Sequence, residues 1–285
     1  MHLHRSFQLW RRLARAEALD VHFDLGLRAF DERDLPRLRQ NLVAVSMLPE
    51  GGLGSIEYLA LSWRLAWLEN RGDDALDAAR AVVRRFPEDP DGVLELAQIL
   101  TDLKRLDEAR EVLQDGVQKR PDDADLWFEL GIVAERLDLE DLRLEAFLVV
   151  WRLEHEDEPD YEPWLDDQAM AAVVERTIAS MPDAVRGAIG NVSIIIDNYP
   201  EQWVVAEGIA DPRILGLFDG PILADEQSTD AVLDGPARIY LYRRNIERTC
   251  RDAEEAQEQV EITTRHEIGH YLGLDEDALD FMGLG

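Results

Sequence analysis

The sequence contains only one cysteine, Cys250, among 285 residues. An internal disulfide and a Cys-x-x-Cys metal knuckle are therefore excluded, and a reducing compartment, the cytoplasm, is the predicted location. Basic residues are also scarce, because 30 Lys and Arg stand against 60 Asp and Glu and give a formal net charge of -30. A field of that sign repels nucleic acids and anionic membranes, so neither is a predicted partner.

Long apolar runs are missing as well. No stretch approaches the roughly 18 apolar residues that a membrane-spanning helix needs. The N-terminus is basic and amphipathic but lacks the continuous apolar stretch of a signal peptide, so we interpret it as an ordinary helix rather than a transit peptide. Hydrophobic residues still make up 46% of the chain, which is enough for the cores of one or two domains.

A period of 34 residues is present in the first half of the chain. It relates Pro87 to Pro121 and Ala75 to Ala109. Apolar residues at equivalent positions of three successive units have the same spacing: Leu59, Val93 and Trp127. Small residues occur where the two helices of a hairpin must approach closely: Ala75, Ala97, Ala109 and Gly131. A repeated helical hairpin is the structure that this pattern predicts.

The last unit contains Trp127-Phe-Glu-Leu-Gly131, with Ala134 three residues further on, and it resembles the first helix of a tetratricopeptide repeat. An earlier copy begins at His22, and we predict about four hairpins over residues 15–158. The fourth departs from the pattern at Arg143, as terminal units of such arrays often do. The resemblance implies a concave surface that binds a peptide or a protein, and the alternative is a scaffold for the next domain.

The composition changes after residue 153. An acidic segment with two prolines, Glu154–Pro163, has the character of a linker. The segments that follow are a helix at 168–180, strands at 192–197, 214–220 and 237–242, and a long helix from 253 to 272 before Gly273. We predict an α-helical TPR-like repeat array at 1–158, a linker at 159–164 and a small α+β domain at 165–285.

The long helix contains His266-Glu267-Ile-Gly-His270. Residues i and i+4 project from one face of a helix, so both imidazoles can reach one cation, with Glu267 beside it. Neutral imidazole suits Zn²⁺, and the adjacent carboxylate can take a proton from metal-bound water. The motif predicts a zinc site held by His266 and His270, with Glu267 as the catalytic base.

A third protein ligand has to be a carboxylate, because residues 161–285 contain no other histidine and Cys250 lies a helix-length upstream. The candidates that follow the turn at Gly273 are Asp275, Glu276 and Asp277. Glu276 comes ten residues after His266, where an extended HExxHxxGxxH motif has its third ligand. We favour Glu276, then Asp275, then Asp277.

Residues from about 165 to the end resemble the minimal zincins, a family of small zincin-like metallopeptidases. The resemblance rests on the segments at 191–197, 215–220 and 239–244 and on Thr264–Gly273, which an acidic cluster follows. The family's motif, HExxHxxGxxD, has an Asp as the third ligand, and this chain has Glu276 at that position. The resemblance implies a zinc-dependent peptidase fold.

The predicted function is hydrolysis of peptide bonds by metal-activated water, with the repeats recognising a peptide or protein. The alternative is a TPR adaptor whose zincin-like domain is inert. If the strand Arg238–Tyr242 lies at a sheet edge, it can pair with an extended substrate. Arg243 and Arg244 are predicted to pair with carboxylates of their own domain, and Tyr240 and Tyr242 to pack on the strand.

The remaining histidines and one methionine carry no predicted chemistry. We interpret His2 and His4 as incidental, and His22 and His155 as structural or solvated. Met282 lies too close to Glu276 to form a methionine turn, so packing is its predicted role.

Overall fold

The computed structural model describes residues 18–48, 51–156, 162–223 and 236–281. The chain divides into two compact units, Met1–Leu153 and Glu154–Gly285. The acidic segment interpreted as a linker begins later than Glu154, because a helix continues to Glu156. Residues 157–161 lie outside the described residues, so the bounds 159–164 stay a prediction. His2, His4 and Met282 also lie outside them.

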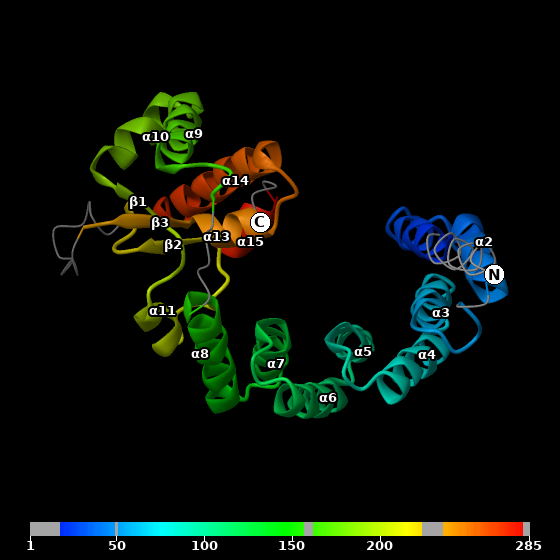
Figure 1. The fold of residues 1–285 in the computed structure, drawn as a ribbon. Coiled ribbons are helices and arrows are strands. Elements are labelled where there is room, and N and C mark those ends of the chain that lie inside the picture. Colours follow the sequence, from blue (N-terminus) through cyan, green and yellow to red (C-terminus); the bar gives the residue numbers. More distant parts are fainter. Residues whose placement is uncertain (1–17, 49–50, 157–161, 224–235, 282–285) are drawn as a thin grey trace, which may run out of the picture. The chain divides into compact units, whose positions relative to one another are not determined.

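The first unit consists of helical hairpins (Figure 1). A helix over residues 18–31 is followed by α2 (Leu35–Met47), α3 (Ile56–Leu68), α4 (Gly72–Arg85), α5 (Pro90–Asp102), α6 (Leu106–Lys119), α7 (Ala124–Arg136) and α8 (Glu140–Glu156). These helices form the four hairpins that the 34-residue period predicts. None of the helices in the described part of the chain is long and apolar enough to cross a membrane.

Each hairpin turns at a residue with a left-handed backbone, and none of these four residues is glycine. They are Arg33 (φ 55°), Asn70 (φ 57°), Lys104 (φ 61°) and Asp138 (φ 55°). The next residue always donates its N–H to the carbonyl five residues earlier, as Arg105 does to Leu100 at 2.8 Å and Leu139 to Ala134 at 2.9 Å. This bond closes the first helix of every hairpin in the same way and fixes where the second helix begins.

Small residues let the paired helices approach each other, as predicted. A methyl group added at Gly131 would lie 2.2 Å from Cε1 of Phe147, which is buried in the next helix. Ala75, Ala97 and Ala109 are almost completely buried in the hydrophobic core of this unit. His22 donates from Nδ1 to the side-chain oxygen Oδ1 of Asn41 at 2.9 Å, which fits its predicted structural role.

The second unit contains a three-stranded sheet and several helices. In chain order its elements are α9 (Asp167–Ser180), α10 (Asp183–Ala188), η1 (Ile189–Asn191), β1 (Ser193–Asp197), α11 (Gln202–Ala206), β2 (Gly216–Asp219), β3 (Arg238–Tyr242), α13 (Arg243–Arg248), α14 (Ala253–Tyr271) and α15 (Glu276–Phe281). All three predicted strands and the long helix are present. The architecture is therefore the α+β domain that the sequence predicts.

The strand order in the sheet is β1-β3-β2. β3 pairs in parallel with β1 and antiparallel with β2, so both of its edges are occupied. The condition under which Arg238–Tyr242 could pair with an extended substrate is therefore not met, because β3 is not an edge strand. β3 is central because its alternating residues Ile239 and Leu241 are fully buried in the core of the unit. The two edge strands of the sheet are β1 and β2, one on each side of β3.

Helix α14 packs against β2 and β3, and α9 packs against α14. The core between them includes Ile239, Leu241, Val260, Ile268 and Tyr271. Since Ile268 and Tyr271 belong to the face of α14 that contacts the sheet, the histidines of the same helix project beside this interface rather than into it.

The chain leaves the sheet at Tyr242, so Arg243 and Arg244 begin α13 rather than extending the strand. Arg243 forms an ion pair with Asp167, as predicted. Arg244 donates from Nε to the hydroxyl of Tyr199 at 3.0 Å. The rings of Tyr240 and Tyr242 stack with centroids 6.3 Å apart, which is the packing role predicted for them.

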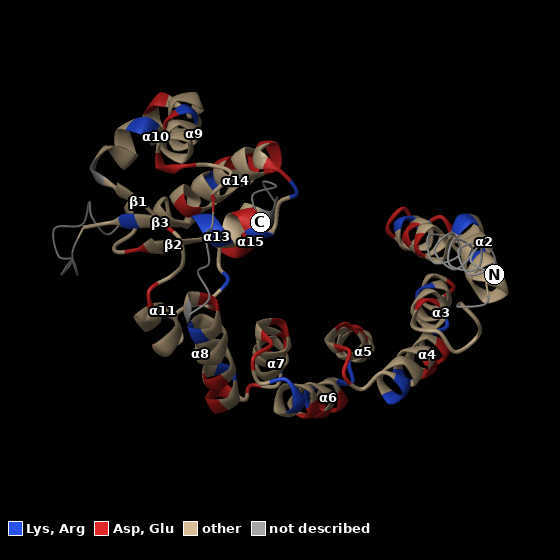
Figure 2. Cartoon of the chain, in the orientation of Figure 1, with Lys and Arg blue, Asp and Glu red and all other residues tan. Residues whose placement is uncertain are grey.

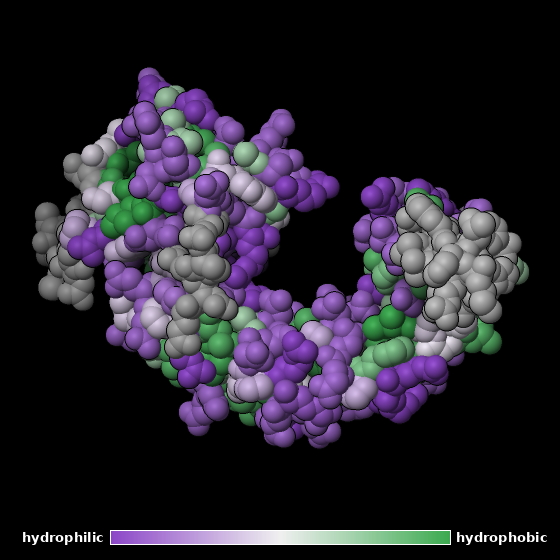
Figure 3. All heavy atoms as spheres, viewed as in Figure 1, coloured by the Kyte–Doolittle hydropathy of each residue, from purple (hydrophilic) through white to green (hydrophobic). Residues whose placement is uncertain are grey.

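Charged residues are spread over both units. Figure 2 shows acidic segments on α5, α6, α7 and α8 of the repeats as well as on α14. The space-filling view shows mainly hydrophilic residues on the visible surface of the repeat helices, with hydrophobic ones between them (Figure 3). In the described part of the chain, the acidic residues are thus distributed over many helices rather than concentrated in one.

Candidate metal centre

Helix α14 positions both motif histidines. Asp252 caps its start by accepting from the backbone N–H groups of Glu254 and Glu255. The helix ends before Gly273, whose φ of +87° is the left-handed cap predicted for it. His266 and His270 lie one turn apart inside this helix, so the backbone fixes both Cα positions.

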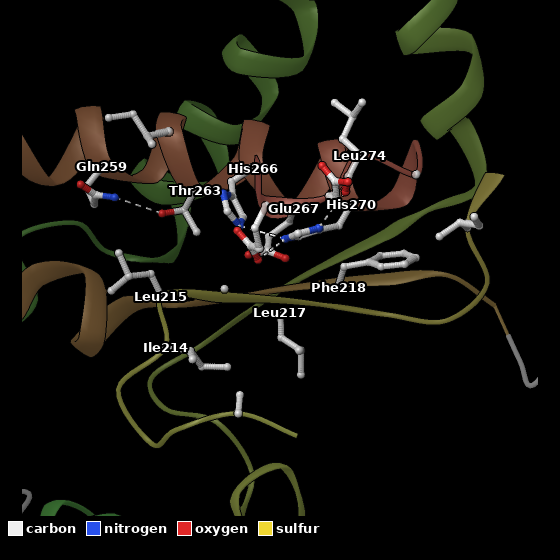
Figure 4. A pocket seen from close by; sticks show the side chains of 17 residues that line it. Ile214, Leu215, Leu217, Phe218, Gln259, Thr263, His266, Glu267, His270 and Leu274 are labelled. Atoms are coloured by element: carbon white, nitrogen blue, oxygen red, sulfur yellow. Dashed lines mark hydrogen bonds and ion pairs between the residues drawn. The ribbon is translucent and has the colours of Figure 1, made fainter. Parts of the chain in front are cut away.

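The two imidazoles point toward one another (Figure 4). Their Nε2 atoms are 2.9 Å apart. The carboxylate of Glu276 lies 3.2 Å from Nε2 of His270 and 3.7 Å from Nε2 of His266. The three potential ligand atoms all lie within 4.8 Å of one another. Two imidazoles and one carboxylate are a donor set that catalytic zinc sites use, with the fourth position left for water or substrate.

A backbone hydrogen bond fixes the ring of His270 on the side away from Nε2. Its Nδ1 lies 3.2 Å from the backbone carbonyl of Leu274. A carbonyl only accepts, so the hydrogen belongs on Nδ1 and the lone pair of Nε2 faces His266 and Glu276. An outer hydrogen bond of this kind fixes the tautomer and orientation of metal-binding histidines in general.

Of the three acidic candidates, only Glu276 reaches the histidines. Asp275 instead caps α15, because its Oδ1 accepts from the backbone N–H of Ala278 at 3.0 Å. Asp277 is exposed and is not part of the ligand cluster. Glu276 is the first residue of α15 and directly follows the turn after α14, so its carboxylate can point back at α14.

Close packing between α14 and α15 holds Glu276 at this place. Leu279 of α15 is fully buried. A methyl group at Gly269 would lie 2.4 Å from Cδ2 of Leu279, so the glycine in the middle of the motif makes room for this side chain. The N–H of Leu274 also bonds to the carbonyl of Gly269 at 3.0 Å. These contacts set the distance from Glu276 to both histidines.

Glu267 is buried beneath the cluster, with 5% of its surface exposed. Its pKa is raised to about 8, mainly by burial; the hydrogen bond from the backbone N–H of Phe218 lowers it, and the charge of Glu276 raises it. A cation held by the neighbouring imidazoles favours the charged carboxylate and lowers this pKa again. Glu267 therefore has the environment of a group that exchanges a proton near neutral pH.

Strand β2 passes directly over Glu267, at Gly216. A methyl group there would lie 2.7 Å from Oε1 of Glu267, 2.8 Å from Cγ2 of Thr263 and 2.9 Å from Cγ of Glu267. Only a residue without a side chain lets the strand approach α14 this closely.

The change Gly216→Ala is expected to lower the free energy of unfolding by about 1–3 kcal/mol, as overpacking does in well-packed sites. It should also displace Glu267. Urea denaturation followed by circular dichroism measures the loss. The matched control is Gly187→Ala in α10, where an added methyl group meets nothing within 4 Å and should leave stability equal or up to about 1 kcal/mol higher. Equal stability of wild type and Gly216→Ala would contradict the close approach.

The histidines, Glu267 and Glu276 line a cleft of about 760 Å³. One wall is β2 with the residues before it, and the other is α14 with the turn that follows. The sequence predicts the residues of α14 but not the opposite wall. Gly216 and Phe218 were part of a predicted strand, and nothing local in the sequence indicates which helix that strand faces.

Comparison with known protein families agrees with this architecture. Residues 189–284 match the family model described as zincin-like metallopeptidase, and residues 66–130 match that of a tetratricopeptide repeat. A search of curated proteins found no match. The chain thus carries tetratricopeptide repeats followed by a zincin-like metallopeptidase domain, in the order predicted.

Proposed function

We propose that this protein is a zinc-dependent peptidase in which His266, His270 and Glu276 hold the metal and Glu267 acts as the catalytic base. The observation that carries the proposal is the cluster of three ligand atoms within 4.8 Å of one another. The cluster lies in the same cleft as the buried carboxylate of Glu267. A structural zinc site has four protein ligands, whereas three leave a position for chemistry.

A zinc ion held there would lower the pKa of a coordinated water toward about 7 and polarise the scissile carbonyl. Glu267 accepts the proton of the attacking water and then delivers it to the leaving amine. Its carboxylate is oriented for this by the backbone N–H of Phe218. With only 5% of its surface exposed, Glu267 has little contact with bulk water while it carries this proton.

The edge strand β2 is suited to align the substrate. It is the outer strand of the sheet next to β3, and Gly216, Leu217 and Phe218 all line the cleft. An extended peptide can add to such an edge through main-chain hydrogen bonds, which places its carbonyl groups in a regular row. We assign to β2 the substrate-pairing role.

The repeats are proposed to bind a peptide or protein, either the substrate or a separate partner. The cytoplasm is the proposed location, since Cys250 is the only cysteine. The alternative function is an adaptor that binds partners through its repeats while the zincin-like domain is inert.

Removal and return of the metal test the proposal. The zinc-loaded protein is expected to cleave peptides. This activity should disappear on chelation and return when zinc is restored, because the attacking water depends on the ion. Mass spectrometric metal analysis of the same samples is the control for zinc content. Zinc-loaded protein that cleaves no peptide in a broad library would favour the adaptor, and turnover that persists without zinc would contradict the mechanism.

A further inference from the structure

The walls of the cleft are mainly apolar. The apolar side chains that line it come from both sides: Ile214, Leu215, Leu217, Phe218, Ile222, Ile262 and Leu274. All seven are only partly buried. Partly exposed aliphatic and aromatic side chains gathered in one concave site are typical of a surface that a ligand covers.

These side chains lie at both ends of the metal cluster. Figure 4 shows Ile214 and Leu215 at the end of the cleft that contains Gln259 and Thr263, and Phe218 and Leu274 at the end near His270. Ile262 precedes His266 by one helical turn, at the first end. Ile222 is at the second end, because its Cδ1 lies 3.6 Å from where a methyl group at Gly273 would be.

The ionisable groups in the cleft are all acids or imidazoles. Among the lining residues that the structure describes there is no Lys or Arg, and the carboxylates are those of Glu267, Asp275 and Glu276. An acidic substrate side chain near the reacting bond would lie close to these carboxylates without a protein cation to pair with. Apolar side chains meet no such cost.

We propose that the cleft takes an extended peptide segment with large aliphatic or aromatic side chains on both sides of the bond that is cleaved. Such segments are buried in folded proteins, so the substrates are unfolded or partly unfolded chains. The inference rests on the proposed peptidase function, since it takes the occupant of the cleft to be a substrate. We choose an apolar peptide segment as the occupant because the apolar walls are continuous with the ligand cluster.

The test uses three labelled peptides of equal length that differ only at two central residues: Leu-Leu, Ser-Ser and Asp-Asp. Their dissociation constants are measured by fluorescence anisotropy with the zinc-loaded full chain carrying Glu267→Gln, which keeps the peptides intact. The Leu-Leu peptide should bind at least about 10-fold more tightly than Ser-Ser, because each leucine removes apolar surface from water. The Asp-Asp peptide should bind no better than Ser-Ser.

The wild-type chain is then assayed with the same peptides, which separates the two proposals. Cleavage of all three with equal kcat/KM would overturn the apolar cleft and leave the peptidase function standing. Selective binding of Leu-Leu without any cleavage would support the apolar cleft and contradict the peptidase function. Equal affinity for all three peptides would overturn the inference.

Two wall variants, Ile262→Gln and Ile222→Gln, probe the two ends of the cleft. Each should weaken Leu-Leu binding by about 5- to 10-fold and leave Ser-Ser binding unchanged, because one apolar contact surface is lost. The control is Ile209→Gln, an isoleucine of the same unit that does not line the cleft and has 49% of its surface exposed, which should change neither. Wall variants that alter the sedimentation mass instead of peptide affinity would show that a second copy covers the cleft, and would overturn the inference.

Discussion

Replacing Glu267 with Gln is expected to lower kcat/KM for peptide hydrolysis by about 10²- to 10⁴-fold, the usual contribution of a general acid-base group. The amide cannot accept the proton of the attacking water, but it keeps the size of the carboxylate. Zinc should stay bound, because Glu267 is not one of the three proposed ligands. Stopped assays with a fluorogenic peptide measure the rate, and metal analysis of the same protein measures the zinc.

The matched control is Glu258→Gln, which changes an exposed carboxylate on the same helix. It should leave both turnover and zinc content at the wild-type level. Turnover by Glu267→Gln within about threefold of wild type would contradict the role of Glu267 as the base, since that is far less than a lost general base costs. Loss of zinc from this variant would show that Glu267 is needed for the metal instead.

Replacing Glu276 with Ala is expected to weaken zinc binding by more than about 100-fold, because loss of an outer-shell partner alone costs about 10- to 100-fold. Turnover should fall in parallel at limiting zinc. Competition with a chromophoric chelator gives the dissociation constant. Glu276→Asp should fall between wild type and Glu276→Ala, since the shorter carboxylate starts from the same backbone position.

The controls are the two neighbouring acids. Asp277→Asn should bind zinc like wild type, since Asp277 is exposed and outside the ligand cluster. Asp275→Asn should also be close to wild type, because Asn remains a good cap for α15. A larger loss of zinc affinity in either control than in Glu276→Ala would assign the third ligand to that residue instead.

The repeat hairpins and the helices at 168–180 and 253–272 could be predicted because the signals are local, whereas the short helices α10, α11, α13 and α15 were not predicted. The apolar spacing and Gly273 after α14 lie within a few residues of the helices that they determine, and the 34-residue period repeats such local signals along the chain. The turns between repeat helices were harder, since Arg33 and Lys104 adopt the left-handed backbone that glycine usually marks. Their position follows from packing of the two helices rather than from residue preference.

Strand order could not be predicted from the sequence. β3 alternates apolar and other residues as an edge strand can, yet it lies between β1 and β2. Which strands pair is decided by contacts between segments far apart in the chain, such as Ser193 with Arg238 in the β1–β3 pair. A single sequence contains no record of those contacts.

The choice among the acidic residues after the motif was open for a similar reason. Spacing favoured Glu276, but Asp275 and Asp277 are its direct neighbours. In the structure the difference comes from the capping bond of Asp275 to Ala278 and from Leu279 packing against Gly269. Both contacts depend on how α15 folds back on α14.

The proposed chemistry depends on the binding of one zinc ion by α14 and Glu276. Its most direct test is the zinc content of the wild-type chain, purified without added metal, beside that of His266→Ala and His270→Ala variants with unchanged circular dichroism. We predict about one zinc ion per wild-type chain and almost none in either variant, since two ligands cannot hold the ion against dialysis. Two results would contradict zinc binding by His266, His270 and Glu276. One is wild-type protein that contains no zinc and does not take it up when zinc is added, and the other is variants that retain zinc.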